Sequence, residues 1–375
     1  MVPLIRAAQR RGHDVVVSSG ADLSELIARL GLTAHRSGMT LSESYARMPD
    51  QVTISELPPD QQAGFAARHL FGAGAVDRAH DLRELMHEWP PDLVVHDTLE
   101  LGAPTVAIMR RVPHVTHGYG PIIPPTSDFA AAIGAAITDA GLPDPIPPVF
   151  AAPYLDVCPP GLHGRDPSPW PTMYPIRPSA GEFDDDGLPP EFDALPHPHT
   201  VYVTLGTIMN QNVGVFRAVI DGCARWPVNL IVTTGPGLDA AQLGPLPAAV
   251  LAVPFLPQAA VLPRCEVVVS HAGAGTMLGA LCYGLPQLCL PQSTDQPFNT
   301  AALLPTGAAL ALQPDEITAD RVADALGQLL QDPSFRDAAR RLRDQIARMP
   351  TPGTVLDHLL REVAGPARRN GPRVP

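Results

Sequence analysis

The sequence contains no lysine, and all 26 of its Lys-plus-Arg residues are arginines. This absence excludes two classes of enzyme. A Walker P-loop needs a lysine on the nucleotide phosphates, and imine-forming or pyridoxal enzymes need a lysine amine as the nucleophile. Any chemistry in this chain must therefore use histidine, carboxylates, hydroxyls and backbone groups.

Cysteine, long apolar runs and basic clusters are also scarce. The five cysteines form no CxxC pair and have no histidines at zinc spacing, which indicates reduced packing residues. No apolar run reaches the ~18 residues of a membrane span, and the first residues lack the order of a signal peptide, so we expect a cytoplasmic protein. A net charge of −12 argues against nucleic acid or an anionic membrane as the partner.

A chain of 375 residues is long enough for two domains that each bury a core. Strand and helix patterns alternate in both halves, which predicts an α/β fold with two doubly wound, Rossmann-like domains facing a cleft. We expect a first domain at 1–178, a linker at 179–199, a second domain at 200–351, and a helix returning to the first domain plus a tail at 352–375. The many prolines of residues 118–180 predict that this region forms no long helix or strand.

Residues 250–300 contain the most informative pattern. A β-branched run, Glu266–Ser270, predicts a buried strand, and Met277–Tyr283 has the pattern of a helix. Between them, Gly273 and Gly275 let a ligand approach the backbone, and the start of the helix favours an anion. A glycine-rich turn between a strand and a helix is also common in α/β proteins without a ligand, so the neighbouring residues are needed to interpret it.

Those neighbours suit a nucleotide bearing a sugar. Phe255 offers an aromatic face to a planar base, and Asp295 and Gln296 follow the next predicted strand with groups that bind hydroxyls. Asp184, Asp185 and Asp186 imitate a metal-binding DxD motif, but their proline-rich setting favours a solvated acidic loop.

The whole stretch resembles the nucleotide-sugar signature of family 1 glycosyltransferases, particularly bacterial enzymes that decorate macrolides and other natural products. The resemblance implies the GT-B architecture and inverting transfer of a sugar from a dTDP- or UDP-sugar to a hydroxyl of a small hydrophobic acceptor, with no metal or other cofactor. It also implies donor contacts: Phe255 on the base, Gln258 beside the nucleoside, Gly206, Thr207, His271, Gly273, Gly275 and Thr276 on the phosphates, and Asp295 and Gln296 on the sugar.

Two further features are interpreted through the same resemblance. Gly279 replaces a glutamate that binds ribose hydroxyls in plant UDP-sugar enzymes, which agrees with a dTDP donor. The proline-rich region shapes the acceptor pocket in the family, and its apolar residues suggest a hydrophobic aglycone: Phe129, Ile133, Ile146, Phe150 and Trp170.

The catalytic base is the gap in this resemblance. The family places a histidine in a glycine-rich loop after the first strand, but Met1 aligns just past that loop. Asp97 matches the carboxylate that orients the histidine, and an N-cap for a helix at Leu101 explains Asp97 equally well. Neither His13 nor His117 is a convincing substitute for the histidine.

The first strand of a doubly wound sheet lies in the middle of the strand order. We therefore expect about 12–20 residues upstream of Met1, carrying an apolar strand and the histidine loop. The alternative is a catalytically incomplete nucleotide-sugar-binding protein that assists a complete transferase, and a homodimer is also left open. A GT-B epimerase is disfavoured because the extra active-site carboxylates are absent from the pattern.

Overall fold

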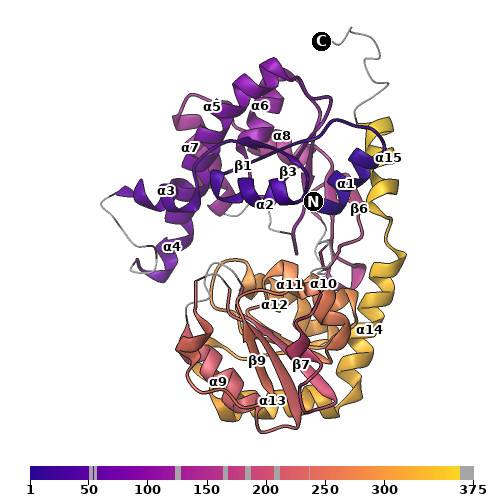
Figure 1. Ribbon diagram of the computed structural model, residues 1–375. Coiled ribbons are helices and arrows are strands. Elements are labelled where there is room, and N and C mark those ends of the chain that lie inside the picture. The colour runs from indigo at the N-terminus through magenta and orange to yellow at the C-terminus, as the bar shows by residue number, and fades with distance from the viewer. Residues whose placement is uncertain are drawn as a thin grey trace. The chain divides into compact units, whose positions relative to one another are not determined.

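The computed structural model describes residues 1–49, 54, 57–122, 128–163, 168–181, 187–206, 212–235 and 237–363. The chain forms two compact α/β units (Figure 1). Unit 1 comprises Met1–Val157, Asp166–Ile176 and Pro350–Pro375, and unit 2 comprises Cys158–Arg165 and Arg177–Met349. None of the helices described is both long enough and apolar enough to span a membrane.

Unit 1 has two separate parallel sheets. One has the order β1-β2 and the other the order β3-β4-β5-β6. The strands are β1 (Val16–Ser19), β2 (Thr33–Arg36), β3 (Val94–Asp97), β4 (His114–His117), β5 (Tyr154–Asp156) and β6 (Met173–Pro175). The helices of unit 1 are α1 (Val2–Arg10), α2 (Ser24–Arg29), α3 (Leu41–Ala46), α4 (Pro59–Ala66), α5 (Ala73–Glu88), α6 (Gly102–Arg110), α7 (Asp128–Asp139), α8 (Ile146–Ala151) and α15 (Pro352–Glu362), with a π-helical segment at Ala67–Gly72.

The last helix, α15, packs against the first one, α1, within unit 1 (Figure 1). α1 begins with Pro3 in its first turn and buries Leu4 and Ala7. The guanidinium of Arg11, which follows α1, donates to Asp357 of α15, with Nε 2.6 Å from Oδ1. Apolar contact and this surface ion pair thus join the two ends of the described chain.

Unit 2 has one six-stranded parallel sheet of order β12-β11-β10-β7-β8-β9. Its strands are β7 (His199–Thr204), β8 (Val228–Thr233), β9 (Val250–Val253), β10 (Val267–Ser270), β11 (Gln287–Cys289) and β12 (Ala309–Ala311). Its helices are α9 (Val213–Cys223), α10 (Gln258–Val261), α11 (Ala274–Cys282), α12 (Gln296–Leu303), α13 (Ala319–Gln331) and α14 (Pro333–Arg348).

Both faces of this sheet are buried, as expected for a parallel sheet covered by helices. Along β7, Val201 and Val203 belong to the core on one face, and Tyr202 belongs to the core on the other. All six residues of β8 are buried. The near-continuous apolar runs of these strands are explained by burial on two sides.

The structure differs from the sequence-based prediction in the proline-rich region. α7 is a helix of 12 residues where no long element was predicted, because no proline falls within Asp128–Asp139. Further along the chain, after β5, residues 158–163 belong to unit 2, although the sequence analysis assigned them to a first domain at 1–178. There the N–H of Gly161 donates to Gln345 Oε1 of α14 at 2.8 Å. Asp184, Asp185 and Asp186 lie outside the described residues.

Candidate functional site

Most of the predicted donor-site residues lie at the carboxyl edge of the unit 2 sheet. β7, the first strand of the unit, is central, with later strands added on either side. β10 pairs with β7 in parallel, Ser270 lying opposite Thr204. The order of strands therefore reverses between β7 and β10, and open α/β sheets bind ligands at such a reversal, outside the carboxyl ends of the strands. Gly206 follows β7 there, and His271 follows β10.

The imidazole of His271 lies between Gly206 and Gly273, at positions where an added Cβ would overlap the ring. A Cβ added to Gly206 would lie 2.8 Å from the imidazole, and one added to Gly273 would lie 2.4 Å from Nε2. Gly206 also has φ +83°, a conformation that L side chains rarely adopt. The absence of side chains at Gly206 and Gly273 thus leaves room for the imidazole at the point where the strand order reverses.

The loop that joins β10 to α11 is strained. Ala272 has φ 62°, in the left-handed region, and its N–H donates to Ser270 Oγ at 3.1 Å. Gly273 is the N-cap of α11, so the free N–H groups of the first helical turn begin directly after His271. Left-handed non-glycine residues cost free energy and cluster at functional sites, which agrees with a ligand at this helix start.

Gln258 and Thr276 form a second contact at the same edge. Gln258 Nε2 donates to Thr276 Oγ1 at 2.9 Å, which joins the start of α10 to the first turn of α11. Gly279, one turn further along α11, allows this approach, since a Cβ there would lie 3.2 Å from Gln258 Oε1. A side chain at position 279 would therefore require the Gln258 amide to shift by a few tenths of an ångström.

Asp295 and Gln296 follow β11, and the structure gives them different surroundings. Asp295 is the N-cap residue of α12. Gln296 is 4% exposed, and its Oε1 accepts from the N–H groups of Gln292 and Ser293 at 2.8 and 3.1 Å. Gln296 thus orders the loop before α12 from inside, while Asp295 lies close enough to raise the pKa of His271.

The sequence analysis did not identify Asn299 as a site residue. Its side chain is 1% exposed, and its Nδ2 donates to Asp295 Oδ2 at 2.6 Å and to the carbonyl of Ala272 at 2.9 Å. It therefore joins the loop beside Asp295 to the loop beside His271. The sequence could have indicated this contact, because Asn299 follows Asp295 by four residues, which puts both side chains on one face of a helix.

The remaining donor-site predictions have simpler outcomes. Phe255 lies in the loop after β9 and is 62% exposed, as a stacking platform for a base needs to be. Gly275 is the second residue of α11, and a Cβ there would meet open space. Thr207 lies outside the described residues.

Burial controls the charge of His271. Its burial lowers its pKa from the ordinary value, and the carboxylate of Asp295 opposes this effect. In the free protein near neutral pH the imidazole is therefore mainly uncharged, and one ring nitrogen carries a proton. A bound anion would favour the protonated form.

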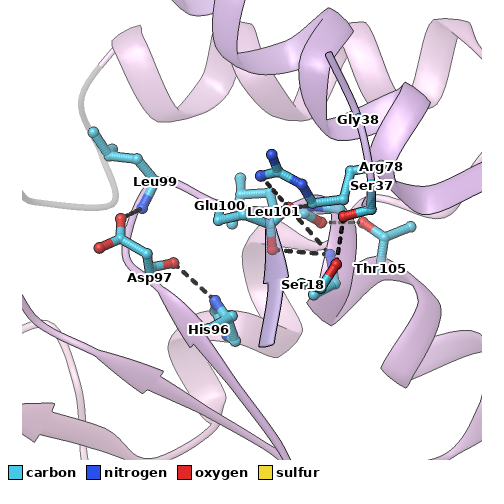
Figure 2. Close-up of polar contacts among 12 residues, drawn as sticks. Ser18, Ser37, Gly38, Arg78, His96, Asp97, Leu99, Glu100, Leu101 and Thr105 are labelled. Carbon is cyan, nitrogen blue, oxygen red and sulfur yellow. Dashed lines mark hydrogen bonds and ion pairs between the residues drawn. The ribbon is translucent and has the colours of Figure 1, made fainter. Parts of the chain in front are cut away.

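Asp97 in unit 1 ends β3 and is not a helix cap. The first turn of α6 is capped by Glu100, whose Oε1 accepts from the N–H of Gly102 at 2.7 Å and whose Oε2 accepts from the N–H of Ala103 at 3.0 Å. Asp97 Oδ1 accepts a hydrogen bond from the N–H of Leu99, in the turn before α6, at 2.9 Å (Figure 2). Burial raises the pKa of Asp97 to about 6.

The histidines near Asp97 are structural. His96 Nδ1 lies 2.9 Å from the backbone oxygen of Asp97, and burial lowers the pKa of His96 to about 4. His117 Nδ1 lies 2.7 Å from the carbonyl oxygen of Gly118, and burial lowers the pKa of His117 to about 3. His13 is exposed in the turn after α1.

The apolar residues interpreted as acceptor-pocket candidates lie in the interior of unit 1. Ile133 is 1% exposed in a core cluster that Phe129 and Ile146 pack against. Trp170 is 2% exposed and contacts the ring of Phe150 at a centroid distance of 4.4 Å. Ile133 and Trp170 are thus buried within unit 1, and the hydrophobic acceptor stays a prediction.

Several known proteins are similar to the chain in sequence or in fold. The chain is 30% identical to L-demethylnoviosyl transferase of Streptomyces niveus, over 96% of the chain and 94% of that protein. It is 28% identical to TDP-daunosamine transferase DnrS of Streptomyces peucetius, over 96% of the chain and 92% of that protein. The solved structure of spinosyn rhamnosyltransferase SpnG complexed with thymidine diphosphate is similar with a TM-score of 0.78 at 23% identity, covering 96% of the chain and 95% of SpnG.

The fold and the sequence together define the class as natural-product glycosyltransferases of the GT-B fold. Within it, residues 6–140 match the N-terminal domain and residues 217–361 the C-terminal domain of erythromycin biosynthesis protein CIII-like proteins. The chain belongs to this EryCIII-like family.

Proposed function

We propose that the chain transfers a sugar from a dTDP- or UDP-sugar to a hydroxyl of a hydrophobic natural product, with inversion at the anomeric carbon and without a metal. The observation that carries this proposal is the position of His271. It is lodged between Gly206 and Gly273 at the strand-order reversal, directly before the free N–H groups of α11. This arrangement suits a diphosphate.

The proposed donor contacts follow from that position. The exposed ring of Phe255 stacks on the base, and Gln258 with Thr276 lies toward the nucleoside. The carboxylate of Asp295, held by Asn299, accepts from sugar hydroxyls. When the bond from the anomeric carbon to the phosphate oxygen breaks, His271 and the start of α11 stabilise the charge on the leaving diphosphate.

The acceptor hydroxyl must lose a proton as its oxygen attacks the anomeric carbon. Asp97, the last residue of β3, is the carboxylate proposed for this role. Its pKa of about 6 leaves it ionised above that pH yet basic enough to accept a proton. Attack opposite to the departing diphosphate produces the inverted configuration.

The donor is proposed to be a dTDP-sugar first and a UDP-sugar second. Gly279 has no side chain that could bind the hydroxyls of a ribose. A 2′-deoxyribose lacks the 2′-hydroxyl and so needs fewer hydrogen-bond partners than a ribose. The relative DnrS of Streptomyces peucetius is by its name a TDP-sugar transferase.

A thermal-shift titration tests the donor site. dTDP in the presence of EDTA is expected to raise the Tm, because a ligand at 100 times its Kd stabilises the native state by about 2.7 kcal/mol. His271→Ala should lose most of this shift. The matched control is His199→Ala, since His199 is an exposed histidine at the opposite end of β7. No dTDP shift, or a shift abolished by EDTA, contradicts the proposal.

A second candidate is an auxiliary protein that binds the nucleotide-sugar without turning it over. The observation favouring it is that, among the described residues, His96 and His117 near Asp97 are buried and bonded to backbone carbonyls. Release of dTDP from a dTDP-sugar, measured with and without a complete transferase, distinguishes the two functions. Release by this chain alone supports the transferase.

A further inference from the structure

Tyr202 carries a hydroxyl group into an apolar part of the unit 2 core. It lies on β7 between Val201 and Val203 and is 2% exposed. The ring of a buried tyrosine packs like any apolar side chain, but its hydroxyl needs a hydrogen-bond partner. The partners of this hydroxyl therefore indicate what a tyrosine does at this position that a valine would not do.

The phenol of Tyr202 reaches toward the carboxyl ends of β7 and β8. Tyr202 lies opposite Ile231 of β8, and Thr204 and Thr233 each follow two residues later on the two strands. Because successive side chains of a strand alternate between faces, both threonines lie on the same face as the phenol. The oxygen of the phenol is 2.8 Å from Thr233 Oγ1, in a contact that is buried. The hydroxyl is therefore at the edge of the sheet where the proposed nucleotide site lies.

Gln258 lies within hydrogen-bonding reach of the same hydroxyl. Burial raises the pKa of Tyr202, and hydrogen bonds with Thr233, Gln258 and Thr204 oppose this effect. Gln258 is the first residue of α10, while the two threonines are at the carboxyl ends of β8 and β7. One buried hydroxyl thus connects a helix and two strands beside the proposed nucleotide site.

The amide of Gln258 has a further partner in α11. Its Nε2 donates to Thr276 Oγ1 at 2.9 Å, and Thr276 is in the first turn of that helix. Because Nε2 is bound to Thr276, Oε1 is the atom of the amide that can accept from Tyr202. The oxygen of Thr276 accepts from Gln258, so its hydroxyl hydrogen remains to be donated to an anion at the start of α11.

Thr204 connects the same phenol to the loop after β7. The Oγ1 of Thr204 accepts from the N–H of Gly206 at 3.3 Å. Gly206 in turn lies so close to His271 that an added Cβ would be 2.8 Å from the imidazole. The loop beside His271 and the start of α11 therefore both connect to Tyr202, one through Thr204 and the other through Gln258.

We propose that Tyr202 is a positioning residue for the nucleotide of the donor, acting through Gln258. In this chain of hydrogen bonds Thr233 donates to the phenol oxygen, and the phenol donates to Oε1 of Gln258. The amide then donates to Thr276, whose hydroxyl donates to a phosphate of the nucleotide. Hydrogen bonds in series polarise one another, so the first bonds of the chain strengthen the last. This inference rests on the proposed function, because it concerns the same nucleotide site.

Titration calorimetry with dTDP compares the 375-residue chain with its Tyr202→Phe variant. The substitution removes one hydroxyl and keeps the ring in the core, and we expect the Kd for dTDP to rise about tenfold. The matched control is Tyr283→Phe. The hydroxyl of Tyr283 also bonds to α10, but it donates to the backbone carbonyl of Ala259, at 3.4 Å. The Kd of this control should stay within about twofold of that of the unchanged chain.

A second variant separates positioning from folding. Tyr202→Phe alone leaves the hydroxyl of Thr233 buried without this partner, which lowers the stability of the fold. Tyr202→Phe combined with Thr233→Val removes both hydroxyls and keeps both shapes. The Tm of this pair variant without ligand should be close to that of the unchanged chain, while its Kd for dTDP should still rise about tenfold. A pair variant with an unchanged Kd overturns the proposal.

The route of the effect is tested by coupling to Gln258. In a chain that already carries Gln258→Met, Tyr202→Phe should change the Kd for dTDP by less than about twofold, because the amide that Tyr202 positions is gone. An equal fold-change in both backgrounds would show that Tyr202 acts on the fold and not through Gln258. Absence of dTDP binding by the unchanged chain contradicts the proposed function, and this inference with it. An unaffected pair variant or an equal fold-change contradicts only the role of Tyr202.

Discussion

Asn299 holds the carboxylate of Asp295 and the backbone of Ala272 with one amide group, at 2.6 and 2.9 Å. Asp295 precedes α12, and Ala272 is the strained residue beside His271. The side chain is 1% exposed, so neither bond is replaced easily by water. The proposed sugar contact and the proposed diphosphate contact are therefore fixed relative to each other by a residue that need not touch the donor.

Asn299→Asp is expected to weaken dTDP binding by tenfold or more. The substitution keeps the shape but removes both donors and puts a second carboxylate against Asp295, and a hydrogen bond to a charged group contributes about 1.5–3 kcal/mol. The control is Asn212→Asp at the N-cap of α9, where the side chain acts as an acceptor for Val215 and aspartate caps equally well. Titration calorimetry with dTDP measures both. Equal dTDP affinities of the two variants would contradict a positioning role for Asn299.

Gly275→Ala is expected to separate folding from binding. A Cβ at Gly275 meets nothing within 4 Å, so the unliganded variant should keep or slightly gain stability, because alanine favours the helix over glycine by about 1 kcal/mol. If the diphosphate lies against the first turn of α11, that Cβ blocks it, and the dTDP-dependent rise in Tm should fall. Gly64→Ala in α4 is the matched control, also with open space at its Cβ. A full dTDP response in Gly275→Ala would place the ligand elsewhere.

Asp97→Asn is expected to stabilise unit 1 above pH 6. Burial raises the pKa of Asp97 from 3.8 to about 6, so the folded state holds a proton that the unfolded state has released between pH 4 and 6. Stability due to this group is therefore present below pH 4 and is lost as pH rises through 6, by roughly 3 kcal/mol at most. Asparagine is uncharged and keeps the bond from Leu99.

Urea unfolding at pH 4.5, 6 and 8 measures that effect. The gain in free energy of unfolding for Asp97→Asn should grow with pH, beyond any change in Asp92→Asn, an exposed carboxyl before the same strand. Activity should fall in the same variant if Asp97 accepts the proton of the acceptor hydroxyl. A gain that is constant with pH would show that Asp97 does not titrate in this range.

The regular parts of both units were predictable because their patterns are local. The run Val228–Thr233 predicted β8 with the bounds that the structure shows, since five of its six residues are apolar or β-branched, which suits a buried strand. The approach of His271 to Gly206 followed from the resemblance and not from spacing. α7 was missed because a region average for proline hid Asp128–Asp139, which contains none.

Tertiary contacts account for what the sequence could not show. Asn299 and Ala272 are 27 residues apart, and only the fold of α11, β11 and α12 brings them together. The N–H groups that Asp97 was predicted to cap are bound instead by Glu100, whose side chain reaches forward to Gly102 and Ala103 of α6. Patterns identify residues that are able to act, and packing decides which of them do.

His117→Asn is expected to flatten the acid side of the stability profile. Burial lowers the pKa of His117 to about 3, so the unfolded state takes up a proton near pH 6.5 that the folded state refuses. Stability due to this group is complete above pH 6.5 and is lost as pH falls, by roughly 3 kcal/mol between pH 7 and pH 4. The amide of asparagine can still donate to Gly118 without titrating. Unfolding at pH 7 and pH 4 should therefore show a smaller loss for His117→Asn than for His80→Asn, which changes an exposed histidine on α5. Parallel losses in the two variants would mean that His117 accepts a proton in the folded chain.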